Sequence, residues 1–175
     1  MTRLDYTTLF RTMATSNKKI GHTADAMHFV RMIMSAAPFA KMDIEEMLQN
    51  TRDTLQDPFM LLATYDFHYE DNRSDNVWKN FMGSYYIIAQ FTQDDYDDRD
   101  AKLDYCEQIV EECNSYLRRY FQTRLANYTL NLNDFHAEAI GPLGENRVGI
   151  RQDFEFKNSG NKALAFDTSK WNTPI

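Results

Sequence analysis

The chain has few of the residues that make disulfides, tight turns and membrane spans. Its 175 residues include two cysteines, four prolines and six glycines. The amino-terminal residues lack the apolar run of a secretory signal peptide, and no uncharged stretch of roughly 18 residues is present that would span a bilayer. We therefore expect a protein that is made in the cytoplasm and does not enter a membrane.

Positive charge is scarce as well. The chain has 19 Lys and Arg side chains against 26 Asp and Glu side chains, which gives a formal net charge of -7. A protein that binds nucleic acid over a broad surface needs basic side chains to neutralise the phosphates. The overall charge argues against such a surface and leaves room only for local basic patches.

The short motifs of hydrolases and nucleotide-binding enzymes are missing. The sequence has no Gly-rich phosphate loop, no G-x-S-x-G elbow, no H-E-x-x-H pair and no Cys-His nucleophile spacing. The glycine-rich stretch 141–144 contains Pro142, which removes a donor amide. Neighbouring carboxylates such as Glu111 and Glu112 point in different directions on a helix, so they cannot flank one substrate bond. We expect a protein that is not an enzyme and has no cofactor.

The two cysteines, Cys106 and Cys113, fall in a predicted helix. They are seven residues apart, which separates them by roughly 10 Å along the helix axis and prevents a disulfide between them. A redox pair or a metal site is the functional alternative. Unbonded cysteines are most often small apolar core residues, and we expect both to be reduced and buried.

The chain does have enough apolar side chains for one substantial core. Hydrophobic residues make up 43% of it, and 12 Phe, 10 Tyr and two Trp supply large rings. The length suits a single domain, which we place at residues 1–157. The remainder, 158–175, is polar apart from Leu164, Phe166 and Trp171, so we expect an extended carboxy-terminal arm that is pinned at intervals.

The amino-terminal part predicts two helices with a strand between them. Apolar residues at helical spacing favour a helix over 4–15, and the short apolar run 28–34 favours a strand, with a helix as the alternative. Asp43 with Glu46 three residues later resembles a capping box at the start of a second helix, which should end near Pro58. One face of that helix would carry Ile44, Met47, Leu48, Thr51 and Leu55.

Two strands follow, and we expect them to form an antiparallel hairpin. The run 59–70 alternates, with one face that packs and a polar face, and the turn-forming segment 71–76 leads into a second strand over 77–91. Gly83 within that strand predicts a bulge or a close backbone approach. The packing face of the first strand would carry Leu61, Ala63, Tyr65, Phe67 and Tyr69.

A long amphipathic helix is predicted over 95–125. Aspartates crowd its start and arginines its end, so its fixed charges oppose the helix dipole at both ends. Its apolar residues recur in steps of three and four, as in a helix that lies across a sheet. This stripe, which should face the hairpins, comprises Leu103, Cys106, Ile109, Val110, Cys113, Leu117, Tyr120 and Phe121.

A second hairpin is predicted from strands over 133–140 and 147–157, which the breakers of 141–146 separate. In the second strand Val148, Ile150, Phe154 and Phe156 should lie on the buried side, with Arg151, Asp153 and Glu155 facing out. The fold class is therefore α+β: an antiparallel sheet of two hairpins, covered by the long helix, with helices at the amino terminus.

Polar clusters with metal-ligand residue types are present. Asp66, His68 and Glu70 would project from one side of a strand, and His136 with Glu138 repeats the pattern. Such alternation is also what the solvent face of a half-buried strand shows, and we favour that interpretation. The aspartates of 94–100 resemble part of a calcium loop without its glycine and distal glutamate, and helix capping explains them better. We expect no bound metal.

Four short segments resemble uncharacterised proteins that are encoded in phages and prophages of Bacteroidetes-type bacteria. The segments are Lys-Ile-Gly-His-Thr at 19–23, Tyr-Asp-Phe at 65–67, Asp-Asn-Arg-Ser-Asp-Asn at 71–76 and Arg-Val-Gly-Ile-Arg at 147–151. The order helix, hairpin, long helix and hairpin over 1–157 is also similar to the tail terminator and neck proteins of tailed phages.

The resemblance implies a structural protein of the virion neck or tail that acts by ring assembly and not by catalysis. The rings of those families are commonly hexameric. The partners would be copies of the chain itself and other neck, portal or tail-tube proteins, with genome DNA passing through without specific binding. Hairpin edges and the arm would form much of the subunit interface, at Leu164, Phe166, Trp171, Arg73, Asp75 and Trp78.

Two alternatives from other classes stay open. One is a metal-dependent or nucleotide-acting enzyme that uses Asp66, His68 and Glu138. The other is a monomeric binding module, such as a host-interacting phage factor, whose aromatic hairpin is the ligand surface.

Overall fold

The computed structural model of the protein describes residues 1–33, 40–51, 54–71, 76–144 and 146–170. It is an α+β structure with one seven-stranded sheet, in the order β1-β2-β4-β7-β5, to which β3 is added beside β4 and β6 beside β7. The strands are β1 Met27–Met32, β2 Leu55–Ala63, β3 Asp66–Asp71, β4 Val77–Gln90, β5 Tyr128–Leu130, β6 His136–Leu143 and β7 Arg147–Ser159.

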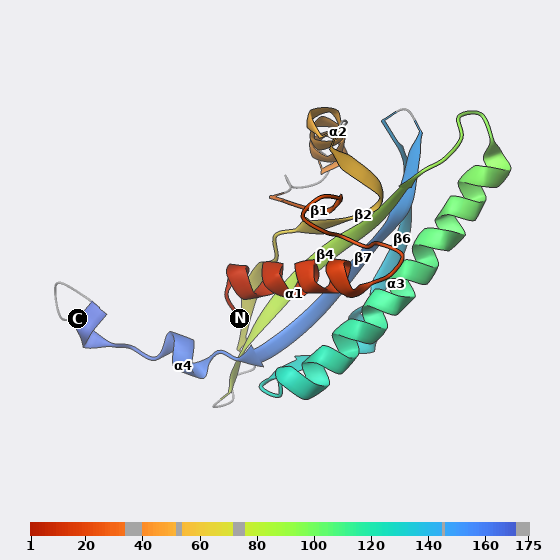
Figure 1. The fold of residues 1–175 in the computed structure, drawn as a ribbon. Coiled ribbons are helices and arrows are strands. Elements are labelled where there is room, and N and C mark those ends of the chain that lie inside the picture. Colours follow the sequence, from red (N-terminus) through yellow and green to blue (C-terminus); the bar gives the residue numbers. More distant parts are fainter. Residues whose placement is uncertain (34–39, 52–53, 72–75, 145, 171–175) are drawn as a thin grey trace.

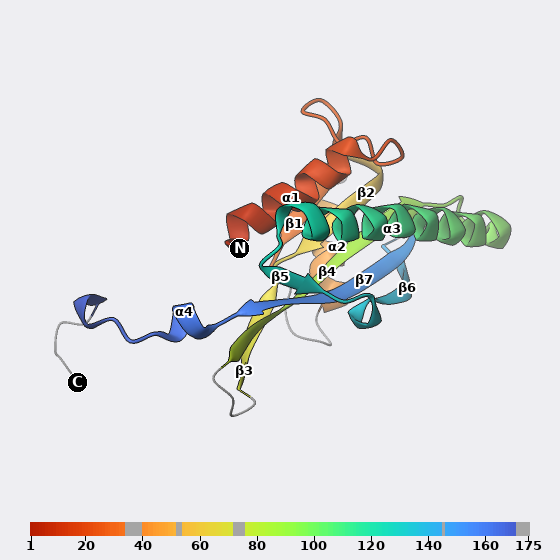
Figure 2. The ribbon, with the colours of Figure 1, turned by 90° about the horizontal axis from the view of Figure 1, so that it is seen from below.

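Three longer helices flank the sheet (Figures 1 and 2). α1 (Arg3–Ser16) and α3 (Tyr96–Arg124) pack on one face and share a core with it, whereas α2 (Ala40–Asn50) packs on the other face over a smaller core. A single turn, α4 (Asn161–Leu164), and two 3-10 turns, η1 (Leu132–Asp134) and η2 (Thr168–Lys170), complete the described elements.

The sheet is mixed, whereas the sequence predicts an antiparallel sheet of two hairpins. β1 and β2 pair in parallel, whereas the other pairs, β2–β4, β3–β4, β4–β7, β5–β7 and β6–β7, are antiparallel. The physical reason lies in the connection, because α2 stands between β1 and β2 in the chain. A crossover that contains a helix brings the next strand back in the same direction, which a short turn cannot do.

α1 and α3 form where the sequence predicts them. Thr2 caps α1 in a full capping box with Asp5, and Asp95 caps α3 by accepting a hydrogen bond from the Asp98 amide. The Asp98 carboxylate in turn accepts one from the Thr92 amide at 2.7 Å, which holds the pKa of Asp98 below its ordinary value. Asp95 therefore caps α3, and Asp98 holds the preceding loop at Thr92. The predicted stripe faces the core, with Cys106, Ile109, Val110, Cys113, Leu117 and Phe121 buried and Leu103 and Tyr120 partly buried.

α2 and β2 differ from the prediction in their boundaries. α2 begins at Ala40, so Asp43 lies in its first turn and not at its cap, and the helix ends at Asn50. An acidic residue stabilises the helix at either place, because both are close to the positive end of the helix dipole. Leu55 and Pro58 belong to β2, where the register against β1 is irregular between Met27 and Phe29. Such an irregularity is where a sheet tolerates a proline.

The run 59–70 is two strands, and not one. Leu61 and Ala63 at the end of β2 pack in the smaller core with α2, whereas Tyr65 packs in the main core beneath α1. The break between β2 and β3 therefore moves residues of the same parity to opposite faces. Both faces of β2 are buried near its end, and β3 is exposed throughout, so the predicted pattern of one packed and one polar face holds for neither strand.

β4 and β7 form the centre of the sheet. They pair without interruption from Trp78 opposite Ser159 to Gln90 opposite Arg147. The predicted bulge at Gly83 is absent from this pairing. Gly83 instead provides room for two rings, because a Cβ atom there would lie 2.7 Å from the Tyr6 hydroxyl and from Phe154 Cζ.

The predicted inward row of β7 is confirmed. Val148, Ile150, Phe154 and Phe156 are at most 7% exposed, while Arg151, Asp153 and Glu155 are less buried. The segment 133–140 contains less strand than predicted, because η1 occupies its start and β6 begins at His136. The short strand β5 precedes both.

The two cysteines are free thiols in the main core, and we expect their replacement to destabilise the fold. Burial raises the pKa of Cys106 and of Cys113 to about 12, so neither is a thiolate near neutral pH. Cys106→Ser or Cys113→Ser should cost roughly 1 to 3 kcal/mol if the new hydroxyl stays unpaired. Urea unfolding measures the loss, with the Cys→Ala variants as apolar controls. A Ser variant as stable as the wild type would show that the thiol sites are not closed to water.

Candidate assembly surfaces

The carboxy-terminal arm begins at a fixed point of the sheet. The Gly160 amide donates to the Val77 carbonyl at 2.7 Å, and the Val77 amide donates to Asn161 Oδ1 at 2.7 Å. Beyond this clamp the arm runs away from the sheet and the helices, as both views show (Figures 1 and 2). Leu164 is 50% exposed and Phe166 is 55% exposed. The arm thus presents large apolar side chains to solvent away from the body of the domain.

The other predicted interface residues fall at or near the origin of the arm. Trp78 is half-buried on β4 opposite Ser159, with Lys157 Nζ at 5.5 Å from its ring centre. The structure therefore brings Trp78 next to the point from which the arm leaves. Arg73, Asp75 and Trp171 lie outside the described residues.

The β3–β4 pair carries a partly exposed aromatic patch. Phe67 and Tyr69 are 43% and 40% exposed, and their rings meet edge to face at 5.9 Å. Lys79 Nζ lies 3.9 Å from the centre of the Phe67 ring, a cation–π contact that places a positive charge on this patch. An apolar surface with one cationic group suits contact with another protein.

Within the described residues, the side chains considered as metal ligands do not gather in one group. Asn80 Nδ2 donates to Glu70 at 3.0 Å and lies 3.2 Å from His68 Nε2, so these two side chains share an amide. Glu138 lies opposite Arg151 on the far side of β7, and about 20 Å of strand separates the levels of His68 and Glu138. Within the described ranges, no group of three His, Cys, Asp or Glu side chains is placed to hold a metal ion.

Ser84, Asp153 and His136 lie in one row across β4, β7 and β6, which invites comparison with a catalytic triad. The Ser84 hydroxyl donates to Asp153 Oδ1 at 2.5 Å, and Arg151 Nε donates to the same oxygen at 2.9 Å. In a Ser-His-Asp triad the serine donates to the imidazole, whereas here the carboxylate lies between Ser84 and the histidine strand. The row is a polar surface of the sheet, on which Asp153 forms an ion pair with Arg151.

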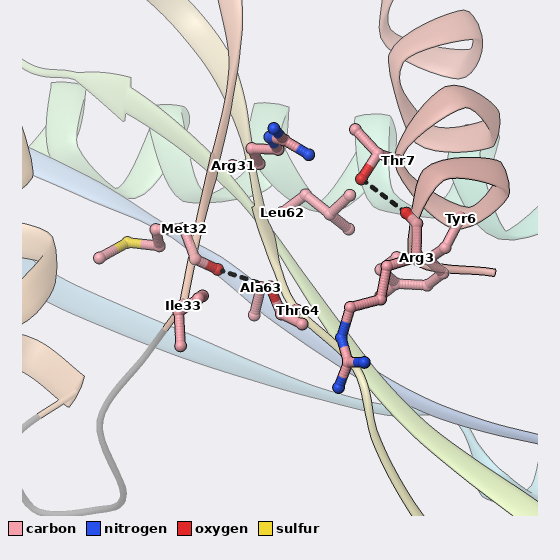
Figure 3. A pocket seen from close by; sticks show the side chains of 9 residues that line it. All are labelled: Arg3, Tyr6, Thr7, Arg31, Met32, Ile33, Leu62, Ala63 and Thr64. Atoms are coloured by element: carbon pink, nitrogen blue, oxygen red, sulfur yellow. Dashed lines mark hydrogen bonds between the residues drawn. The ribbon is translucent and has the colours of Figure 1, made fainter.

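A cavity of about 330 Å³ opens between α1 and the ends of β1 and β2 (Figure 3). Its apolar lining comes from Tyr6, Met32, Ile33, Leu62 and Ala63, and its polar lining from Arg3, Thr7, Arg31 and Thr64. Sequence reasoning did not single out this site. Arg3 and Arg31 are far apart in the chain, and only the packing of α1 across β1 brings them to one cavity.

No family model matches the chain, and no curated protein matches it at a significant level. No helix of the described residues is long and apolar enough to cross a membrane.

Proposed function

We propose that the protein is a structural component of a phage particle, at the neck or tail, that acts by ring assembly and not by catalysis. Its partners would be other copies of the chain and neighbouring neck, portal or tail-tube proteins. The four segments that resemble phage-encoded proteins and the predicted order of helix, hairpin, long helix and hairpin support this proposal, and the tail-terminator-like fold is part of it. Genome DNA would pass through the ring without specific binding, since the net charge of -7 repels phosphate.

The observation that carries the proposal is the exposed arm. Leu164 and Phe166 stay about half exposed in the isolated domain. Ordering a polar segment costs conformational entropy, and docking of its large apolar side chains on a second molecule offsets that cost. An arm that is clamped at its base by Gly160 and Asn161 and then leaves the domain can reach a neighbouring subunit in a closed ring.

We expect the double variant Leu164→Ser/Phe166→Ser to have the mass of a monomer in solution and the same unfolding midpoint as the wild type. A chain that lacks residues 162–175 should behave in the same way. The reason is that these residues are exposed in the monomer, so their loss affects association and not the core. Multi-angle light scattering across a range of concentrations measures the mass. Neck or tail components are added in a parallel series, in case the ring forms only on them.

Leu132→Ser is the matched control, because Leu132 is 49% exposed but lies in η1, away from the arm. It should keep the oligomer. A wild-type chain that stays monomeric in both series, or an arm variant that assembles like the wild type, would contradict the proposed role of the arm.

A monomeric binding module is the second candidate, and the aromatic patch of Phe67 and Tyr69 favours it. In that case the protein would stay monomeric with or without its arm, and Phe67→Ser/Tyr69→Ser would abolish capture of its ligand. The light-scattering series therefore separates the two candidates.

A further inference from the structure

Charge changes sign along α3. Residues 94–112, which lead into the helix and form its first part, carry nine Asp and Glu side chains against two Lys and Arg side chains. Residues 113–133, which form the rest of the helix and the segment after it, carry three Arg side chains and no Asp or Glu. The helix therefore has an acidic start and a basic end.

The basic end of α3 has a hollow of about 410 Å³ on its surface. The residues that line it are Tyr116, Arg119, Tyr120, Thr123 and Arg124. The ring centres of Tyr116 and Tyr120 lie 6.3 Å apart with an interplanar angle of 16°, and both rings pack against the main core, which holds them in place. The hollow thus combines a fixed aromatic wall with two guanidinium groups.

Neither arginine of the hollow is neutralised within the described part of the chain. Arg119 and Arg124 are exposed and form no ion pair there, whereas Arg151 pairs with Asp153 at 2.9 Å. The helix dipole involves only Arg124, because its effect falls off beyond the last turn and Arg119 precedes that turn. The hollow therefore suits a ligand that offers an aromatic side chain together with carboxylates.

The segment 94–97, at the other end of α3, has this composition. Tyr96 is 71% exposed, and the three aspartates beside it are exposed as well. Within the described residues Asp94 and Asp97 form no ion pair. The segment thus presents an aromatic ring among uncompensated negative charges.

The cations nearest to this segment already have partners. Arg99 lies 4.9 Å from the centre of the Tyr96 ring, but its charge is paired with Asp100 at 2.9 Å. Lys102 lies 3.9 Å from Asp98. The segment and the hollow are therefore complementary in charge and in aromatic character.

The segment 94–97 cannot reach the hollow of its own chain. Asp97 and Arg119 belong to one continuous helix, whose rise separates them by about 33 Å along the axis. Both views show the start of α3 at one extremity of the domain, away from its other end (Figures 1 and 2). A contact between the two surfaces therefore requires two molecules.

We propose that the hollow at the end of α3 receives the segment 94–97 of a second copy of the chain, with Tyr96 against the tyrosine rings and the aspartates on the two arginines. This inference rests on the proposed self-assembly and names a contact that the assembly uses. The contact is heterologous, because each subunit offers the segment at one end of α3 and the hollow at the other. Such contacts close into a ring when the rotation between subunits allows it.

Two charge reversals test the contact, one on each surface. Arg119→Glu in the hollow and Asp97→Lys in the segment should each weaken self-association at least about tenfold, because attraction between opposite charges becomes repulsion. Combining both changes in one chain should restore most of the association, since the exchanged charges attract again. A 1:1 mixture of the two single variants should co-assemble for the same reason. Sedimentation velocity over a range of concentrations measures the association, alone and with neck and tail components.

Arg118→Glu is the matched control for the hollow, because it makes the same change in charge at the neighbouring exposed residue, which is outside the lining. Asp104→Lys, at an exposed position farther along α3, is the control for the segment. Both should assemble like the wild type. Tyr96→Ser leaves the charge unchanged and should weaken association roughly threefold to tenfold, because the ring loses its aromatic contacts. Thermal unfolding followed by far-UV circular dichroism reports whether each variant folds.

The outcomes separate this contact from the proposed ring assembly. If the arm variant Leu164→Ser/Phe166→Ser dissociates while both charge reversals assemble like the wild type, ring assembly stands and the α3 contact is refuted. The contact is also refuted if Arg118→Glu weakens association as much as Arg119→Glu, or if neither the combined variant nor the mixture regains it. A hollow that retains a DNA duplex, with association unchanged in Arg119→Glu, would be a phosphate site and not a docking site. A wild-type chain that does not associate, alone or with neck and tail components, overturns both proposals.

Discussion

Gly149→Ala is expected to destabilise the protein by at least about 3 kcal/mol. A Cβ atom at this position would lie 2.2 Å from the Ile87 carbonyl oxygen and 3.0 Å from Ile88 Cα. These are backbone atoms of β4, which pairs with β7 from Trp78 to Gln90 and is buried on both faces there, with Ile87 in the main core and Ile88 in the smaller core. The clash therefore cannot be relieved by the rotation of a side chain, and the two central strands would have to separate.

Chemical unfolding monitored by circular dichroism measures this loss, and two other glycines calibrate it. Gly144→Ala should cost only about 1 to 2 kcal/mol, because its φ of +57° disfavours a side chain but nothing lies within 4 Å of the new Cβ. Gly83→Ala meets the ends of two buried rings, Tyr6 and Phe154, and should fall between the others. If Gly149→Ala and Gly144→Ala were equally stable, the close approach of β4 and β7 would be wrong.

The elements that were predicted from sequence are those with one buried face. α1, α3 and β7 each set apolar residues at a regular period against one core, so their side-chain pattern records which face is covered. The stripe of α3 and the inward row of β7 were both confirmed for this reason. A periodic pattern of apolar residues arises only where one face of an element is buried and the other is exposed to solvent, as it is in these elements.

The prediction of one strand over 59–70 was wrong because its first part has no solvent-exposed face. The end of β2 is covered by α1 on one face and by α2 on the other, so its apolar residues form a continuous run without alternation. In the exposed strand β3, Phe67 and Tyr69 fall by coincidence at the same odd-numbered spacing as Leu61 and Ala63. The parallel pairing of β1 with β2 also left no local signal, because a crossover connection is a property of the path of the chain and not of adjacent residues.

The candidate surfaces were only partly predictable. Exposed apolar residues in a polar tail, such as Leu164 and Phe166, stand out in composition and predict an arm. Arg3 and Arg31, by contrast, are ordinary surface arginines until α1 packs across β1. The excess of positive charge in residues 1–31 was the available signal, and the net charge of the whole chain concealed it.

A buried polar network in the main core also escaped sequence reasoning. Gln152 stands in the inward row of β7 and is 1% exposed. Its Nε2 donates to the carbonyl oxygens of His136 and Asp153 at 3.1 and 2.7 Å, and its Oε1 accepts from Asn114 Nδ2 at 3.0 Å. Asn114 Oδ1 in turn accepts from the Tyr85 hydroxyl at 2.7 Å. The network joins α3 to β4, β6 and β7.

We expect Gln152→Leu to cost about 2 to 4 kcal/mol, because it leaves the partly buried Asn114 Nδ2 and two backbone carbonyls without this partner. Tyr85→Phe removes one terminal donor and should cost about 1 kcal/mol. The triple variant Tyr85→Phe/Asn114→Leu/Gln152→Leu removes the side chains of the network together, so fewer polar groups remain unpaired. Its loss in urea unfolding should therefore be smaller than the sum of the three single losses. Strictly additive losses would mean that the three side chains act independently and that the network does not hold α3 on the sheet.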